Sequence, residues 1–190
     1  MINYGKQHID KNDKYSVLKT LSDKLITQGP KVNLFENLLK KKFGSKYCSV
    51  VSSGTAALHL AGLAFQWKKG DIILCSTLTF VATSNCILYC GAQPDLVDID
   101  KNNYNIDLHK LEQKLKFYKN KKKKVKAVIV TDYAGNPADW TKIKKLSKKY
   151  SFNTINDNCH AIGASYLGSQ KYAVKYADLV THSYHPVKNI

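Results

Sequence analysis

Ala127-Val128-Ile129-Val130-Thr131 is a run of apolar and β-branched residues that predicts a strand buried on both faces of a sheet. A helix-like stretch follows at residues 138–150, and a second short run with strand character follows at Asn153–Asn156. A strand, a helix and a strand in this order predict one unit of a parallel sheet.

The same alternation extends along most of the chain. Further strands are predicted at Tyr47–Val51, Ile72–Cys75, Asp95–Ile99 and Leu179–His182. The pattern predicts an α/β fold with a three-layer, mostly parallel sheet and helices on both faces. In such sheets ligands bind at the carboxyl ends of the strands.

Apolar residues at helical spacing predict a first helix at residues 13–26, which Gly29-Pro30 should stop, and a second at 31–43, which Gly44 should end. We therefore divide the chain into an N-terminal segment with the first helix, residues 1–30, and a large domain, residues 31–190. Other helix-like stretches lie at residues 55–66, 79–90 and 107–118.

Length and composition exclude several classes of protein. A chain of 190 residues can bury the core of one α/β domain, and no apolar run approaches the roughly 18 residues that cross a bilayer. Met1–Lys6 lacks the hydrophobic core of a signal peptide, so we expect a cytoplasmic protein. The five cysteines are odd in number and form no C-x-x-C pair, so we expect reduced thiols, no disulfide framework and no zinc site.

The chain is strongly basic, with 30 lysine and arginine residues against 14 acidic ones and a formal net charge of +16. The densest run is Lys121–Lys124. A nucleic-acid surface interleaves arginine or aromatic residues with its charge, and only Phe117 and Tyr118 offer that here. We favour a solvated linker between a helix and a strand, without a nucleic-acid partner, although a general attraction to anions stays open.

Ser52-Ser53-Gly54-Thr55-Ala56-Ala57-Leu58 follows a predicted strand and opens a helix. A glycine at that turn lets the backbone approach a ligand closely, and amides and hydroxyls at a helix start suit a phosphate. An ordinary Ser/Thr helix cap is the alternative interpretation of the same residues.

Two further segments follow predicted strands. Phe80 is placed to lie flat against an aromatic ring, although a core phenylalanine is the simpler interpretation. Asp157 is placed to pair with a pyridinium nitrogen, and His160 to form a hydrogen bond near a ring oxygen. Metal ligation, or a helix cap with a buried histidine, would also fit Asp157 and His160.

Ser183 and Lys188 complete the set near the end of the sequence. The serine offers a hydroxyl to a phosphate, and the lysine amine can form an imine and then move a proton. A lysine is usually a solvated surface charge. Four segments in this order, each after a strand, nevertheless indicate pyridoxal phosphate held by Lys188 as a Schiff base.

These segments resemble the pyridoxal-phosphate-dependent aminotransferases of the DegT/DnrJ/EryC1/StrS family, which have the aspartate-aminotransferase fold (fold type I). The similarity extends from about Tyr4 to Ile190. Some relatives with this fold carry histidine in place of the lysine and perform dehydration, so Lys188 favours transamination. The shared motifs are Leu25–Pro30, Ser52–Leu58, Thr79–Thr83, Asp132–Gly135, Asp157–Ala164 and His185–Ile190.

The resemblance implies a role for each of these positions. Lys188 matches the lysine that bonds to the cofactor, Asp157 the partner of the pyridine nitrogen, and His160 the residue near the ring hydroxyl. Phe80 matches the aromatic residue that stacks on the ring. The phosphate cradle that the resemblance implies consists of Gly54, Thr55, Ala56 and Ser183. The implied nucleotide-sugar contacts are Tyr4, Lys24, Leu25, Ile26 and Thr27.

Within the family, the chain most resembles the branch that serves pseudaminic acid biosynthesis. The amino acceptor of that branch is a UDP-linked 4-keto-6-deoxy-N-acetylhexosamine, glutamate is the usual donor, and a homodimer is expected of the complete enzyme. The residues that suggest this branch are Tyr4–Gln7, Asn85–Ala92, Val97–Asp100 and Tyr104–Asp107.

The chain also departs from the family pattern. The family continues past the lysine with further strands and a small C-terminal domain, so residues 31–190 are expected to form an incomplete cofactor-binding domain that is a poor enzyme alone. A non-catalytic remnant that still binds phosphate ligands, and a basic nucleic-acid-binding protein, are the alternatives. Asn158-Cys159 replaces smaller residues, and Tyr184 stands where phenylalanine is commoner.

Overall fold

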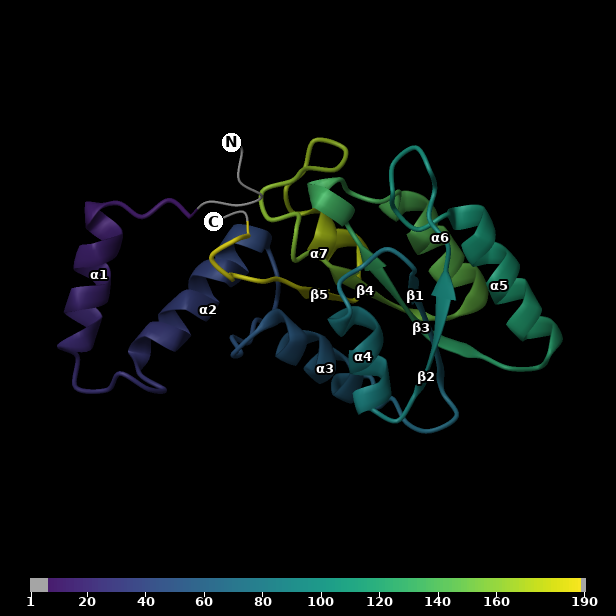
Figure 1. Ribbon diagram of the computed structural model, residues 1–190, viewed down its shortest axis with the longest axis horizontal. Helices are drawn as coiled ribbons and strands as arrows, with labels where there is room; N and C mark the ends of the chain where they lie inside the picture. Colours follow the sequence, from purple (N-terminus) through teal and green to yellow (C-terminus); the bar gives the residue numbers. More distant parts are fainter. Residues whose placement is uncertain (1–6, 189–190) are drawn as a thin grey trace.

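The computed structural model describes residues 7–188, which contain a parallel five-stranded sheet with helices on both faces (Figure 1). The order of the strands across the sheet is β2-β1-β3-β4-β5, and every neighbouring pair is parallel. This confirms the α/β class that the sequence predicts. The strands are β1 Ile72–Ser76, β2 Gln93–Val97, β3 Val125–Thr131, β4 Asn153–Asp157 and β5 Leu179–Thr181.

Alternate residues of the central strands supply two separate cores, because successive side chains of a strand point to opposite faces. Ile73 and Ile129 pack in one core with residues of α3 (Gly54–Ala64) and α4 (Ala82–Tyr89). Leu74 and Val128 face the other core, whose helices are α5 Leu108–Asn120, α6 Trp140–Tyr150 and α7 Tyr172–Tyr176. The three layers follow from this division.

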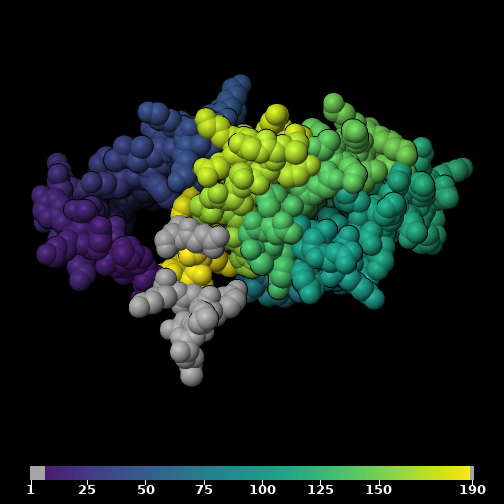
Figure 2. All heavy atoms as spheres, turned by 90° about the horizontal axis from the view of Figure 1, so that it is seen from above, coloured from purple at the N-terminus to yellow at the C-terminus, as the bar shows by residue number. Residues whose placement is uncertain are grey.

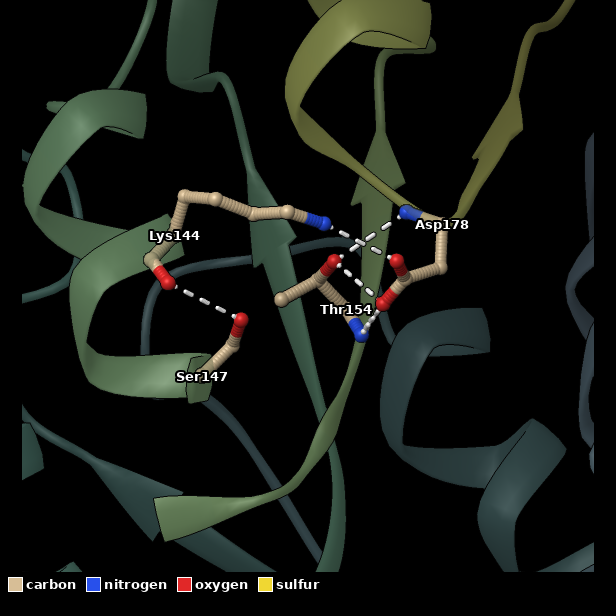
Figure 3. Close-up of polar contacts among 4 residues, drawn as sticks. All are labelled: Lys144, Ser147, Thr154 and Asp178. Carbon is tan, nitrogen blue, oxygen red and sulfur yellow. Dashed lines mark hydrogen bonds and ion pairs between the residues drawn. The ribbon is translucent and has the colours of Figure 1, made fainter. Parts of the chain in front are cut away.

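The short edge strand β5 is tied to the sheet by a carboxylate at its start. Asp178 accepts hydrogen bonds from the backbone N–H of Thr154 at 2.8 Å and from the Thr154 hydroxyl at 2.9 Å (Figure 3). Lys144 of α6 forms an ion pair with the same carboxylate at 3.0 Å. The position of β5 beside β4 therefore rests on polar contacts as well as on the strand ladder.

The two N-terminal helices lie to one side of the sheet (Figure 1). α1, Lys11–Leu21, begins at a capping box formed by Asp10 and Asp13, and none of its residues, all of which the structure describes, is buried. α2, Pro30–Phe43, ends at Gly44, whose left-handed backbone (φ 72°) confirms the predicted stop. The Phe43 ring stacks on His182 with ring centroids 4.4 Å apart, which joins the end of α2 to the end of β5.

The prediction of one helix over residues 13–26 is wrong at its C-terminal end. α1 ends at Leu21, where the N–H groups of Ser22 and Asp23 turn back to the carbonyls of Lys19 and Thr20. Most helical stability in proteins comes from packing of an apolar face. Because no residue of α1 is buried, additional turns would gain little stability. Gly29-Pro30 instead begins the next helix, with Gly29 as its N-cap.

The predicted strand at Tyr47–Val51 is also wrong, since these residues join no ladder in the described part of the chain. Tyr47 is 78% exposed, and the N–H of Val50 is bound by the Glu36 carboxylate at 2.9 Å instead of by a neighbouring strand. Strand-forming residues need a partner strand. Residues 47–51 and β5 line the same cleft and form no ladder with each other.

Lys121–Lys124 forms the exposed connection between α5 and β3, as the linker interpretation predicts. The short helix α7 is an element that the apolar pattern did not reveal. The other predicted strands and helices coincide with observed ones to within about three residues at each end, which is the usual uncertainty of such boundaries.

Candidate active site

A cleft of about 1490 Å³ runs along β5 and α3 and reaches the carboxyl ends of β3 and β4, where Thr131 and Asp157 line it. Its walls come from the C-terminal half of α2, from residues 45–53, from the start of α3 and from residues 179–188. Figure 2 shows the C-terminal residues in yellow between the purple and blue N-terminal helices and the green part of the α/β core. The cleft therefore lies where the sequence predicts ligand binding.

One end of the cleft is the N-terminus of α3. Ser53 caps this helix by accepting the N–H of Ala56 at 3.1 Å, whereas Gly54 and Thr55 line the cleft. The first N–H groups of a helix have no partner inside the helix and carry partial positive charge, which suits a phosphate. Ser183 lines the same region, so Gly54, Thr55 and Ser183 come together, while Ala56 is not among the lining residues.

The backbone at Gly54 is close to two neighbours. A Cβ on this residue would lie 3.2 Å from the Cys159 sulfur and 3.4 Å from the Ser183 Cβ. Burial is the main reason that the pKa of the Cys159 thiol is raised above its usual range. The start of α3 thus packs directly on the loop that follows β4, which brings two predicted parts of the site into contact.

Asp157 is the last residue of β4 and is 3% exposed. Its Oδ2 accepts a hydrogen bond from the Thr83 hydroxyl at 2.8 Å, and its Oδ1 accepts the Cys159 N–H at 3.3 Å. None of the lysine–carboxylate ion pairs found among residues 7–188 involves Asp157. A buried carboxylate in a cleft, unpaired with lysine, fits a cationic ligand group such as a protonated ring nitrogen.

His160 lies within electrostatic range of both Asp157 and Lys188. The chain turns after Ser183, with the Lys188 N–H bonded to the His185 carbonyl at 2.8 Å, and Lys188 lines the cleft. Burial lowers the pKa of His160, the positive charge of Lys188 lowers it further, and Asp157 acts in the opposite direction. His160 therefore favours its neutral form, in which the ring offers one hydrogen-bond donor and one acceptor.

Phe80 lies at the rim of the cleft with 64% of its surface exposed. The interpretation of Phe80 as a core residue is therefore wrong. An aromatic ring that is exposed at the mouth of a cleft is available to a flat ligand.

The structure does not bring the expected nucleotide-sugar contacts to this cleft. Lys24, Leu25, Ile26 and Thr27 are exposed in the connection between α1 and α2 and are not among the lining residues. Tyr4 lies outside the described residues. The four described positions therefore do not line the cleft, and their contact with a nucleotide sugar stays a prediction.

A family model supplies the observation that decides the identification: the model of the DegT/DnrJ/EryC1/StrS aminotransferase family matches residues 7–190. The chain belongs to this family. It is similar to the UDP-4-amino-4,6-dideoxy-N-acetyl-beta-L-altrosamine transaminase of Campylobacter jejuni subsp. jejuni, with 42% identity over 190 residues. That match covers 100% of this chain and 49% of that protein.

Two solved structures share this fold. Helicobacter pylori PseC, an aminotransferase involved in the biosynthesis of pseudoaminic acid, matches with a TM-score of 0.85 and 32% identity over 99% of this chain and 49% of that one. NtdA of Bacillus subtilis, with bound cofactor PMP, matches with a TM-score of 0.82 and 31% identity over 96% of this chain and 40% of that one. These likenesses confirm fold type I. The chain spans about half the length of the relatives that it matches.

Within residues 7–188, no group of three or more histidine, cysteine, aspartate or glutamate residues is placed to hold a metal ion. The helices of the described residues are all too short or too polar to cross a membrane.

The sequence placed Asp132 in a shared motif but did not reveal its contacts with the residues beside Asp157. Asp132 is fully buried and accepts hydrogen bonds from Asn156 and Asn158, the two residues that flank Asp157, at 3.0 Å each. Burial raises the pKa of Asp132, and the hydrogen bond from Tyr172 opposes that shift. The two asparagines beside a site aspartate were the available signal, because buried amides need polar partners.

Proposed function

We propose that this chain is the cofactor-binding part of a pyridoxal-phosphate-dependent sugar-nucleotide aminotransferase. The observation that carries the proposal is the placement of Asp157, Lys188, Phe80 and the start of α3 around one cleft. Residues 31–190 would form the large domain around that cleft, and residues 1–30 an N-terminal segment.

The residues present fit the cofactor in size and in chemistry. Lys188 would hold the aldehyde carbon covalently, and Asp157 would bind the ring nitrogen in its protonated form. Phe80 would cover one face of the ring. Gly54, Thr55 and Ser183 would bind the phosphate, together with the backbone of Ala56. When bound, pyridoxal phosphate supplies an electron sink for the transfer of an amino group.

The protein side chains would then hold and move protons. The Asp157 carboxylate, which is nearly buried, would accept a hydrogen bond from the protonated ring nitrogen and so keep that proton in place. The Lys188 amine would act as the group that takes up and returns a proton during the transfer. His160 favours its neutral form and would orient the ring oxygen by a hydrogen bond.

The names of the relatives suggest the class of amino acceptor. We infer a UDP-linked 4-keto-6-deoxy-N-acetylhexosamine as amino acceptor and glutamate as donor, in a cytoplasmic homodimer. The similarity to altrosamine transaminases of Campylobacter jejuni and Helicobacter pylori, at 42% and 34% identity, supports this acceptor. Tyr4 and residues 24–27 would contact the nucleotide sugar. Because the chain spans about half of these relatives, turnover is a property that we assign to the complete protein.

A two-step assay tests the proposal. Pyridoxal phosphate is added to the purified protein and the visible imine band is recorded, and then keto-sugar nucleotide and glutamate are supplied and the amino sugar is detected. We expect the band with the native chain and its loss in Lys188→Ala. A native chain that binds phosphate ligands but forms no band would instead support a non-catalytic remnant.

A further inference from the structure

Three threonine hydroxyls form a continuous line of hydrogen bonds that ends on Asp157. The Thr131 and Thr79 hydroxyl oxygens are 2.8 Å apart, the Thr79 and Thr83 oxygens are 2.8 Å apart, and Thr83 donates to Oδ2 of Asp157 at 2.8 Å. We propose that this hydroxyl line is a positioning device for Asp157, with Thr83 as its principal positioning residue. The inference rests on the proposed function only in assigning Asp157 to the ring nitrogen.

The direction of all three hydrogen bonds follows from the charge at the end of the line. An ionised carboxylate only accepts hydrogen bonds, and each threonine has a single hydroxyl proton. Thr83 therefore gives its proton to Asp157 and must accept from Thr79. Thr79 has then used its own proton and must accept from Thr131. All three O–H groups point toward the carboxylate, and bonds aligned in this way polarise and strengthen one another.

The line is fixed in place by burial and by the elements that supply it. Thr83 lies in the first turn of α4, Thr131 ends β3, and Asp157 ends β4; all three are buried. In the sheet register Thr131 is directly paired with Asp157. The hydroxyl of Thr131 is nevertheless linked to the Asp157 carboxylate through Thr79 and Thr83, the second of which belongs to α4.

The same hydroxyl line holds the segment that carries Phe80. Thr79 precedes Phe80 and Thr83 follows it by three residues, and the Thr83 N–H donates to the Phe80 carbonyl at 2.9 Å. One set of hydrogen bonds thus connects the segment that would cover the cofactor ring with the carboxylate that would bind the ring nitrogen. We expect the two to be set relative to each other by Thr79 and Thr83.

The hydrogen bond from the Thr83 hydroxyl to Asp157, at 2.8 Å, is shorter than the bond from the Cys159 N–H. A second contact, from the Cys159 N–H to Oδ1, is longer at 3.3 Å. Thr83→Val keeps the branched shape and removes the hydroxyl, so it should release Oδ2 and let the carboxylate rotate. Thr83→Ser keeps the hydroxyl and should restore the contact.

The experiment begins on the protein without cofactor. Urea unfolding is measured for the native chain, Thr83→Val, Asp157→Ala and the double variant. We expect Thr83→Val to lower the unfolding midpoint in the native background and to have little further effect in Asp157→Ala, since the two groups lose one shared interaction. Thr154→Val is the matched control, because Thr154 is also buried and also donates to a carboxylate, that of Asp178, at 2.9 Å (Figure 3). It should lower stability without coupling to Asp157.

Cofactor binding then separates positioning from a general loss of structure. We expect Thr83→Val to weaken pyridoxal phosphate binding about tenfold, which corresponds to about 1.4 kcal/mol, and Thr83→Ser and Thr154→Val to leave it near the native value. In the complete enzyme Thr83→Val should lower kcat more than it changes KM. If Thr83→Val does not fold, Thr79→Val removes the preceding link and should weaken binding in the same direction.

The outcomes keep the two proposals apart. Additive effects of Thr83→Val and Asp157→Ala on unfolding, or native cofactor affinity in Thr83→Val, would overturn the positioning role. A native chain that binds no pyridoxal phosphate would count against the proposed function, whereas coupling between the two residues in the cofactor-free protein would still support the hydroxyl line.

Discussion

The Cys159 sulfur lies 3.2 Å from the position that a Cβ on Gly54 would take, which is a tight contact. The N-terminus of α3 and the loop after β4 are therefore in direct contact. In the proposed site, the first would bind the phosphate of the cofactor and the second would lie beside its ring nitrogen. The size of residue 159 thus limits what residue 54 can be.

Gly54→Ala tests this contact. Alanine inside a helix is usually more stable than glycine by roughly 0.5–1 kcal/mol, but here the added methyl group meets the sulfur. We expect Gly54→Ala to be neutral or destabilising in the native chain and to stabilise by about 0.5–1 kcal/mol in Cys159→Ala. Urea unfolding of the native chain, the two single variants and the double variant measures the difference. Equal effects in both backgrounds would show that the sulfur does not restrict this position.

Phe80→Ala should separate ligand binding from stability. Because 64% of Phe80 is exposed, removal of the ring should cost well under the 3–5 kcal/mol typical of a buried phenylalanine. Loss of ring stacking should weaken pyridoxal phosphate binding roughly 3- to 10-fold, the equivalent of about 0.5–1.5 kcal/mol. A titration by absorbance measures the affinity, with Phe117→Ala as a control in an exposed ring of α5. Unchanged affinity in Phe80→Ala would remove this residue from the site.

Asp157→Asn should damage chemistry far more than folding. Asparagine can still accept the hydrogen bond from Thr83, so the loss of stability should stay near 1 kcal/mol. The neutral amide cannot hold the proton on the ring nitrogen, and we expect the amino-transfer half-reaction to slow at least about 100-fold. Stopped-flow absorbance on the complete enzyme gives this rate. A mutant with the native rate would contradict the assigned role.

His182 predicts a loss of stability in mild acid. Burial lowers the pKa of this histidine to about 4, below its usual 6.5, while its ring stacks on Phe43. Between pH 6.5 and 4, His182 is therefore protonated in the unfolded chain but stays neutral in the folded chain. The free energy of unfolding is highest above pH 6.5 and falls by about 2–3 kcal/mol as the pH drops to 4. Carboxylates with lowered pKa values, such as Asp178, lose their contribution at lower pH.

Unfolding midpoints measured across this pH range test the prediction for His182. His182→Phe keeps the stacking on Phe43 and should flatten the profile between pH 6.5 and 4. His109→Asn, a change at an exposed histidine of α5, serves as the control and should leave the profile unchanged. A native profile that is already flat would contradict the lowered pKa of His182 in the folded chain.

The sequence correctly predicted helices with local end signals and strands whose neighbours in the sheet are also apolar, strand-forming segments. The run at residues 127–131 became part of β3 because both of its neighbours are strands with the same character. The segment at Tyr47–Val51 has similar composition and still forms no strand, since an open cleft lies between it and β5. Composition alone does not say whether a neighbouring strand is present.

The site shows the same limit. The predicted cofactor positions at the ends of strands, such as Asp157, were visible because each follows a recognisable strand. The hydroxyl line was not visible, because Thr79 and Thr131 are 52 positions apart and Thr83 and Asp157 are 74 apart. Only the packing of α4 against the sheet brings these side chains within hydrogen-bonding distance, and threonines carry no pattern that reveals such a contact.

Reductive trapping of the cofactor tests the central claim most directly. The protein is mixed with pyridoxal phosphate, reduced with borohydride, digested, and the modified peptide is identified by mass spectrometry, with Lys188→Ala as the control. The account predicts a pyridoxyl group on Lys188 in the native chain and its loss in the variant. Modification spread over other lysines, such as Lys121–Lys124, with none concentrated on Lys188, would contradict the assignment of this cleft as a pyridoxal phosphate site.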